Sequence, residues 1–186
     1  WSMPQSTKQA LAASLGKLLV RKPLDDITVK EIVESCQVNR QTFYYHFQDI
    51  YDLLRWYLDH ESEAVLAKCT TWQEAVLNTF LFTREHHVAV YHIFRSTGRE
   101  HMDCHFYTMA YKITSRIFAH ESEGLSLSAE DLEFLSDFYM YALAGMMIGW
   151  VANGMKEEPA DLVRQISRLL DGDFRRLAEK YAGHIS

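Results

Sequence analysis

Two short helical segments joined by a three-residue turn constrain the fold of this chain more than any other feature. Thr28 stands three residues before Glu31, which is the spacing of a capping box at a helix start. Cys36-Gln37-Val38 forms a turn, and Asn39 is a favourable N-cap for a second short helix over residues 40–46. The spacing therefore predicts a helix-turn-helix.

The second helix of this pair has two faces. Phe43 and Phe47 lie four residues apart, so they point the same way, and we expect them to face inward. Val38 is the strongly apolar residue of the turn, and we expect its side chain to pack between the two helices. The polar and tyrosine side chains are left for the outer faces, namely Arg40, Gln41, Thr42, Tyr44, Tyr45 and His46.

The rest of the chain also predicts helices. It has 186 residues with 3 prolines and 8 glycines, and strand-like alternation is hard to find, so we expect an all-α fold of about nine helices. Residues 1–48 would form a three-helix head. A fourth helix over about 50–68 would link it to a body of about six helices within 49–186, ending in one helix over 161–182.

One apolar run bears on membranes. Residues 138–152 give 15 consecutive residues of low polarity, whereas a membrane span needs about 20. We interpret the run as a buried packing helix and expect no membrane association.

Charge and cysteine use indicate the compartment and the partner. The formal net charge is −6. Residues 1–48 hold six basic and four acidic residues, a net of +2, and the remainder holds 13 basic and 21 acidic residues, a net of −8. A mildly basic head on an acidic body is typical of nucleic-acid binding. The 3 separated cysteines and the lack of a signal-like N-terminus predict a cytoplasmic protein without disulfides.

Residues 28–54, TVKEIVESCQVNRQTFYYHFQDIYDLL, resemble the tetracycline-repressor (TetR) family of transcriptional regulators. Three departures stand out: Val33 occupies the position of the family's usual alanine, Gln37 that of its turn glycine, and Ile50 that of its phosphate-binding lysine. Further along, F-Y-x-Y-A-x-x-G and W-x-x-x-G-M are similar to the activators of dihydroxyacetone-kinase operons. The matching residues of the head are Thr28, Val29, Ile32, Val38, Thr42, Phe43, Tyr44, His46, Phe47, Leu53 and Leu54.

The resemblance implies a sequence-specific regulator that binds double-stranded DNA. In such a head the second helix of the pair enters the major groove, where Arg40 can pair with guanine and Gln41 with adenine. Most other contacts reach phosphates and sugars. The alternative is that Tyr44 and Tyr45 only cover the hydrophobic head. The expected DNA-binding residues are Thr28, Lys30, Asn39, Arg40, Gln41, Thr42, Tyr44, Tyr45 and His46.

One head reads few base pairs, so the resemblance implies a homodimer on a palindromic operator. The last two helices are the expected dimer surface, because a G-x-x-x-G spacing lets helices approach closely. An ordinary intrachain core is the alternative. The expected interface residues are Gly145, Ile148, Gly149, Ala152, Ile166, Leu169 and Leu170.

Aromatic side chains of the body with polar tips are candidates for an effector pocket. The effector can be a small molecule or a protein, and plain core packing is the alternative. The candidate residues are Phe80, Tyr91, Phe94, Tyr107, Tyr111 and Trp150.

Other functions have weaker support. His101 and His105 have a spacing that permits a metal on one helix face, but no third ligand is fixed, so we expect neither metal nor cofactor. No Gly-rich phosphate loop, nucleophile elbow or recognisable carboxylate pair supports an enzyme or any catalytic residue. The remaining alternative is a helical protein-interaction module with a decayed head, which Ile50 and Gln37 favour.

Overall fold

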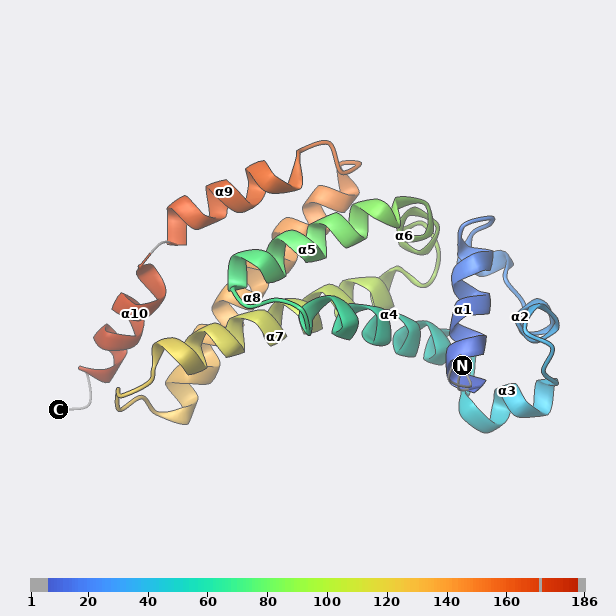
Figure 1. Cartoon of the computed structure of the whole chain (residues 1–186), viewed down its shortest axis with the longest axis horizontal. Coiled ribbons are helices and arrows are strands. Elements are labelled where there is room, and N and C mark those ends of the chain that lie inside the picture. Colours follow the sequence, from blue (N-terminus) through green and yellow to red (C-terminus); the bar gives the residue numbers. More distant parts are fainter. Residues whose placement is uncertain (1–6, 171, 184–186) are drawn as a thin grey trace. The chain divides into compact units, whose positions relative to one another are not determined.

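A computed structural model describes residues 7–170 and 172–183 of the chain (Figure 1). These residues form helices joined by turns and contain no strand, so the predicted all-α fold is confirmed. The elements are α1 (Thr7–Leu19), the 3-10 helix η1 (Leu24–Asp26), α2 (Val29–Ser35), α3 (Arg40–His46), α4 (Ile50–Leu66), α5 (Trp72–Glu85), α6 (His87–Phe94), α7 (Arg99–Glu121), α8 (Ala129–Ala152), α9 (Pro159–Leu170) and α10 (Asp173–Ala182).

The chain divides into two compact units that are not continuous in sequence. Among the described residues, the first unit takes residues 7–64 together with 85–105, and the second takes residues 65–84, 106–170 and 172–183. Both α4 and α7 therefore contribute residues to each unit. The division into a head over residues 1–48 and a body over 49–186 follows the predicted helices and stays a prediction.

The core of the first unit is built from α1 and the two helices of the helix-turn-helix. Leu11, Leu15 and Leu19 recur at the four-residue spacing of a helix face, and all three are fully buried. The buried Ser14 hydroxyl donates a hydrogen bond to the Ile32 carbonyl at 2.8 Å, so α1 is also joined to α2 by a polar contact. These contacts set the position of the short helices that follow.

Within the first unit, the turn between α6 and α7 is hydrogen-bonded to residues of η1 and α4. The Asp25 carboxylate accepts hydrogen bonds from the Thr97 N–H at 3.1 Å and from the Thr97 hydroxyl at 2.5 Å. The Tyr51 hydroxyl also lies 2.5 Å from that hydroxyl. One turn earlier, His92 Nδ1 lies 2.6 Å from the carbonyl oxygen of Leu19. The start of α7 is thus held by residues of η1 and α4.

The second unit packs α8 against α5 and α7 through aromatic and hydroxyl contacts. The rings of Phe80 and Trp150 meet edge to face with centroids 4.9 Å apart, and both side chains are buried. The fully buried Thr114 hydroxyl donates to the Ser136 carbonyl at 2.9 Å, which gives this apolar interface a directional contact.

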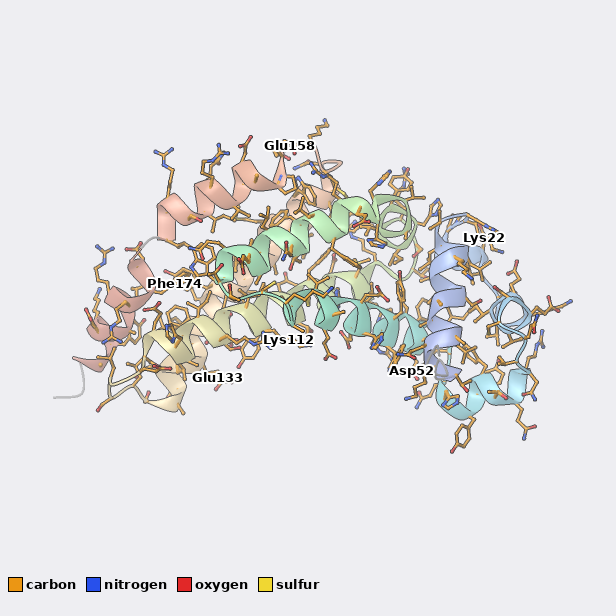
Figure 2. The ribbon with its side chains drawn as sticks, in the orientation of Figure 1. Lys22, Asp52, Lys112, Glu133, Glu158 and Phe174 are labelled. Carbon is orange, nitrogen blue, oxygen red and sulfur yellow. The ribbon has the colours of Figure 1, made fainter. Side chains whose placement is uncertain are left out.

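The end of the chain departs from the prediction of one final helix over 161–182. Helix α9 stops at Leu170 and α10 starts at Asp173, with Gly172 in the left-handed region at φ 73°. The break lets α10 return its Phe174 ring, labelled in Figure 2, to the rings of Phe118 and Tyr139, with centroids 5.3 and 5.1 Å away.

Helix α8 has 24 residues, which is longer than the apolar run that identified it. By length and composition it is the one helix in the described ranges that can cross a membrane, and a third of its most apolar window is buried inside the chain. The prediction of a buried packing helix therefore holds for one face of α8, while the opposite face needs another explanation.

Candidate nucleic-acid interface

Helix α3 is placed by its cap and by two phenylalanines. Asn39 Oδ1 accepts a hydrogen bond from the Thr42 N–H at 2.7 Å, so a side chain satisfies one of the free donors at the helix start. Phe43 is fully buried and Phe47 is 4% exposed, with their ring centroids 6.1 Å apart. The inward pair anchors the helix and leaves its other faces to solvent.

The turn before α3 bends through a left-handed residue. Gln37 has φ 58°, a conformation that suits glycine and strains a residue with a β-carbon. The turn then closes when the Val38 N–H donates to the Val33 carbonyl at 3.0 Å. Gln37 therefore occupies a position where the backbone itself favours glycine.

Replacing Gln37 with glycine is expected to stabilise the protein by about 0.5–1 kcal/mol, because relief of the left-handed strain outweighs the added freedom of the unfolded chain. Gln37→Ala is the matched control, since it removes the side chain and keeps the strain. Thermal denaturation followed by circular dichroism compares the two variants. Equal melting temperatures for glycine and alanine would contradict the backbone argument.

Four side chains of α3 form an exposed polar surface. Arg40 and Gln41 are exposed and have no hydrogen-bond or ion-pair partner among the residues that the structure describes. Tyr44 is 59% exposed and Tyr45 is 84% exposed, and within the described ranges neither hydroxyl is bonded. Free donors and acceptors at the surface of one short helix are what recognition of a DNA groove requires.

Other predicted contact residues are engaged in holding the helices. The Thr28 hydroxyl accepts from the Glu31 N–H at 3.3 Å and donates to Glu31 Oε2 at 2.8 Å. The Thr42 hydroxyl donates to Asn39 Oδ1 at 2.9 Å. Thr28 and Asn39 are thus primarily caps that position the surface, and Thr42 keeps its methyl group and its oxygen lone pairs for a ligand.

Lys30 belongs to α2, and His46 is the last residue of α3. Lys30 Nζ is 3.8 Å from Glu34 Oε1 on an exposed stretch of α2, an ion pair loose enough to exchange for another anion. His46 is half-buried at the end of α3, with its ring centroid 5.0 Å from that of Tyr45.

Glu31 links α2 to the turn that follows α1. Lys22, labelled in Figure 2, places its Nζ 2.6 Å from Glu31 Oε1. The hydrogen bond from Lys22, with further hydrogen bonds from the Thr28 hydroxyl and N–H, lowers the pKa of Glu31 from 4.5 to about 2. A carboxylate with a lowered pKa stabilises the fold above pH 4.5, and this stabilisation is lost as the pH falls toward 2.

Lys22→Met is therefore expected to raise the pKa of Glu31 toward 4.5 and to remove part of the stability that the wild type shows between pH 5 and 7. Carbon-13 NMR of the Glu31 carboxyl measures the pKa, and thermal denaturation across pH 2–7 measures the stability. Lys30→Met removes a lysine that does not contact Glu31 and should leave the titration of Glu31 unchanged. An unaltered Glu31 pKa in Lys22→Met would refute the assigned cause.

The start of α4 lacks the cation that the resemblance leads one to expect. Ile50 is its first residue, and the helix is capped by carboxylates instead. Asp49 Oδ1 accepts from the Asp52 N–H at 2.8 Å, and Asp52 Oδ2 accepts from the Gln48 N–H at 3.1 Å. Two negative charges at this terminus disfavour a phosphate, so position 50 stays outside the candidate interface.

The predicted dimer residues fall into two groups. Gly145 and Ala152 are exposed, Leu169 is 73% exposed, and Ile148 and Gly149 are half-buried. Ile166 and Leu170 are buried within the chain, where they hold α9 in place, and so are not accessible on its surface.

The predicted effector residues do not line one common pocket. The cavity that Phe80 lines with residues of α5, α7 and α8 has a volume of about 20 Å³, room for about one water molecule. The Trp150 ring packs against the Phe80 ring. The Tyr107 ring packs against the Tyr141 ring, with centroids 5.7 Å apart.

The remaining three effector candidates, Tyr91, Phe94 and Tyr111, are exposed to solvent or contact an arginine. Tyr111 is 39% and Tyr91 52% exposed, and the Tyr91 hydroxyl accepts from Arg95 at 2.5 Å. The centroid of the Phe94 ring lies 4.2 Å from the Arg99 guanidinium carbon. These aromatic residues therefore pack or face solvent in the state described here.

The histidines of α7 have separate partners. The His101 ring lies 5.2 Å from the Tyr51 ring, and His105 Nδ1 lies 3.3 Å from Asp59 Oδ1. No group of three potential ligands able to hold a metal occurs within residues 7–170 and 172–183.

A three-helix head that contains a helix-turn-helix with an exposed second helix, followed by a helical body, has the architecture of a helix-turn-helix regulator. The family model described as "Bacterial regulatory proteins, tetR family" matches residues 9–55, and the model described as "Transcriptional regulator C-terminal region" matches residues 70–172. The second match alone covers more than half of the chain. The chain belongs to the TetR family, it is a transcription regulator, and the expectation that it is not an enzyme is confirmed by this membership.

Comparison with solved structures supports the fold. The structure of the "Dihydroxyacetone kinase operon activator DhaS" is similar with a TM-score of 0.70, over 91% of this chain and 96% of that chain. The two sequences are 20% identical, so the similarity concerns the fold. No curated protein sequence matches the chain.

Proposed function

We propose that the protein regulates transcription as a homodimer in the cytoplasm, with one α3 in the major groove of each half of a palindromic operator. Arg40 and Gln41 carry this proposal, because both are exposed on α3 and neither has a hydrogen-bond or ion-pair partner within residues 7–170 and 172–183. An arginine donates two parallel hydrogen bonds to guanine and a glutamine pairs in the same way with adenine, so both residue types distinguish bases. Tyr44 and Tyr45 are suited to the flanking phosphates and sugars.

The dimer is supported by an apolar stripe on α8. Phe134, Phe138 and Tyr141 are each more than half exposed, and the stripe continues through the exposed Gly145, the half-buried Ile148 and the exposed Ala152. These residues follow one another at alternating spacings of four and three, the repeat that packs one helix against another. A second copy of α8 would cover this face, which also accounts for its exposure without a membrane.

The two glycines of this helix strengthen the argument. A β-carbon added at Gly145 or Gly149 would meet no atom within 4 Å in the described part of the chain, so packing there does not require a glycine at either position. Glycine inside a helix costs about 1 kcal/mol relative to alanine. Close approach of a partner helix is a physical reason to keep them.

Selection from random double-stranded DNA tests the function directly. Purified full-length protein should enrich a two-fold symmetric sequence whose half-sites lie about one helical turn, or a multiple of it, apart. Fluorescence anisotropy at several salt concentrations then measures the affinity. Binding that depends steeply on salt and enriches no sequence, or no binding at all, would favour the interaction module with a decayed head.

Control by an effector is the second part of the proposal. A ligand that binds the body more tightly in one conformation shifts the population of conformations that can bind DNA. The effector is either a small molecule or a protein, and no cofactor or metal is needed for DNA binding.

A further inference from the structure

A cavity in the second unit lies apart from the aromatic residues that the sequence suggested. It has a volume of about 330 Å³, within the range of small-molecule sites. It is formed by the end of α4, the start of α5 with the loop before it, and the second half of α7. Its size is sufficient for a ligand in the described state, in contrast to the 20 Å³ space beside Phe80.

The floor of the cavity is apolar and firmly packed. Leu66, Ala75, Ile113 and Ile117 line it, and each is less than a tenth exposed. Trp72 adds an indole ring whose orientation is set by an edge-to-face contact with Phe174, at a centroid distance of 5.7 Å. These side chains are placed to cover the hydrocarbon part of a ligand.

The polar groups of the lining include an unused cation. The Arg116 guanidinium has no hydrogen-bond or ion-pair partner in the part of the chain that the structure describes, and the same holds for the Gln73 amide. His120, by contrast, lies 3.5 Å from Glu123. An arginine beside an apolar floor is suited to a planar carboxylate, which it can hold through two parallel hydrogen bonds.

The start of α5 does not supply the anion site. Glu74 Oε2 already accepts hydrogen bonds from the Thr70 N–H, the Thr70 hydroxyl and the Thr71 N–H, at 2.8, 2.8 and 3.3 Å. A carboxylate of the chain itself thus occupies the helix terminus, and attraction for a ligand has to come from Arg116. Glu121 also lines the cavity, and its negative charge disfavours a ligand with more than one carboxylate.

We infer that this cavity binds a small apolar monocarboxylate, with Arg116 holding the carboxylate and the Trp72 side of the cavity covering its aryl or alkyl group. The inference rests on the proposed function, since it assigns the effector class of the regulator. Arg116 is a binding residue of the body and takes no part in the DNA surface.

Isothermal titration calorimetry of the full chain with 4-phenylbutyrate tests the inference, with the neutral 4-phenylbutanamide as the matched probe. We expect one site per chain for the acid and markedly weaker binding of the amide. Arg116→Gln should weaken binding of the acid by about ten- to a hundredfold and leave the affinity for the amide unchanged. Arg164→Gln, which removes a charge from the Arg164–Asp161 pair on α9, is the control.

Equal affinity for acid and amide, an unaltered acid affinity in Arg116→Gln, or no binding at millimolar acid would each overturn the inference. Circular dichroism and operator binding confirm that the variants fold. If the protein selects an operator but does not bind the acid, the ligand assigned to the cavity is wrong and the proposed function as a DNA-binding regulator stands. Protein that binds the acid and selects no DNA sequence would contradict the proposed function instead.

Discussion

Gly145→Arg is expected to convert the protein into a monomer and to weaken operator binding by about a hundredfold or more, because two linked heads gain that much from binding together. A β-carbon at this position would meet no atom within 4 Å among the described residues, and the position is exposed, so the fold of the monomer should survive. In a dimer the same side chain would place a charge at the centre of the α8 stripe. Light scattering at micromolar concentration measures the mass, and fluorescence anisotropy measures the affinity.

Two variants make this result specific. Gly145→Ala adds one methyl group and should keep the dimer, while gaining helix propensity. Ala119→Arg places the same charge at an exposed position of α7, outside the stripe, and should also remain a dimer. A dimeric Gly145→Arg protein would show that the interface lies elsewhere, and a monomeric wild type would remove the dimer from the proposal.

Arg40→Ala is expected to cost about 1–3 kcal/mol of operator affinity and to relax the base preference at one position of each half-site. Because the guanidinium has no partner in the described chain, the substitution removes no contact that holds the fold. Repeating the DNA selection with the variant identifies the position that Arg40 reads, and anisotropy gives the size of the effect.

Arg21→Ala is the matched control, since Arg21 is an exposed arginine of the head that lies beyond α1 and outside α3. This variant should bind all DNA sequences somewhat more weakly, because it loses one positive charge that attracts phosphates, and its base preference should be unchanged. If Arg40→Ala kept both the affinity and the preference of the wild type, α3 would not be the helix that reads the operator.

Local patterns made the head predictable from the sequence. Thr28 and Asn39 cap their helices as the spacing indicated, and Phe43 and Phe47 separate from the exposed residues because a four-residue period determines which side of a short helix they occupy. Such features depend on neighbours within a few residues. The departure at Gln37 was also visible, and the backbone there is left-handed as the position requires.

The body was less predictable because its contacts join distant segments. Aromatic content suggested a pocket around Phe80 and Trp150, yet their rings pack against each other and fill the space. The cavity beside Trp72 combines residues from 66 to 121, whose spacing carries no periodic signal. The break at Gly172 was missed because the apolar period continues on both sides of it.

The continuity of α7 has a thermodynamic consequence. This helix runs without interruption from Arg99, directly after the turn that Asp25 holds, to Glu121 at the cavity. If occupancy of the cavity alters operator affinity, then operator DNA must alter the affinity for the carboxylate by the same factor, whichever the sign. Titrating the acid with and without operator DNA, and the DNA with and without the acid, would therefore give the coupling free energy twice, from two independent experiments.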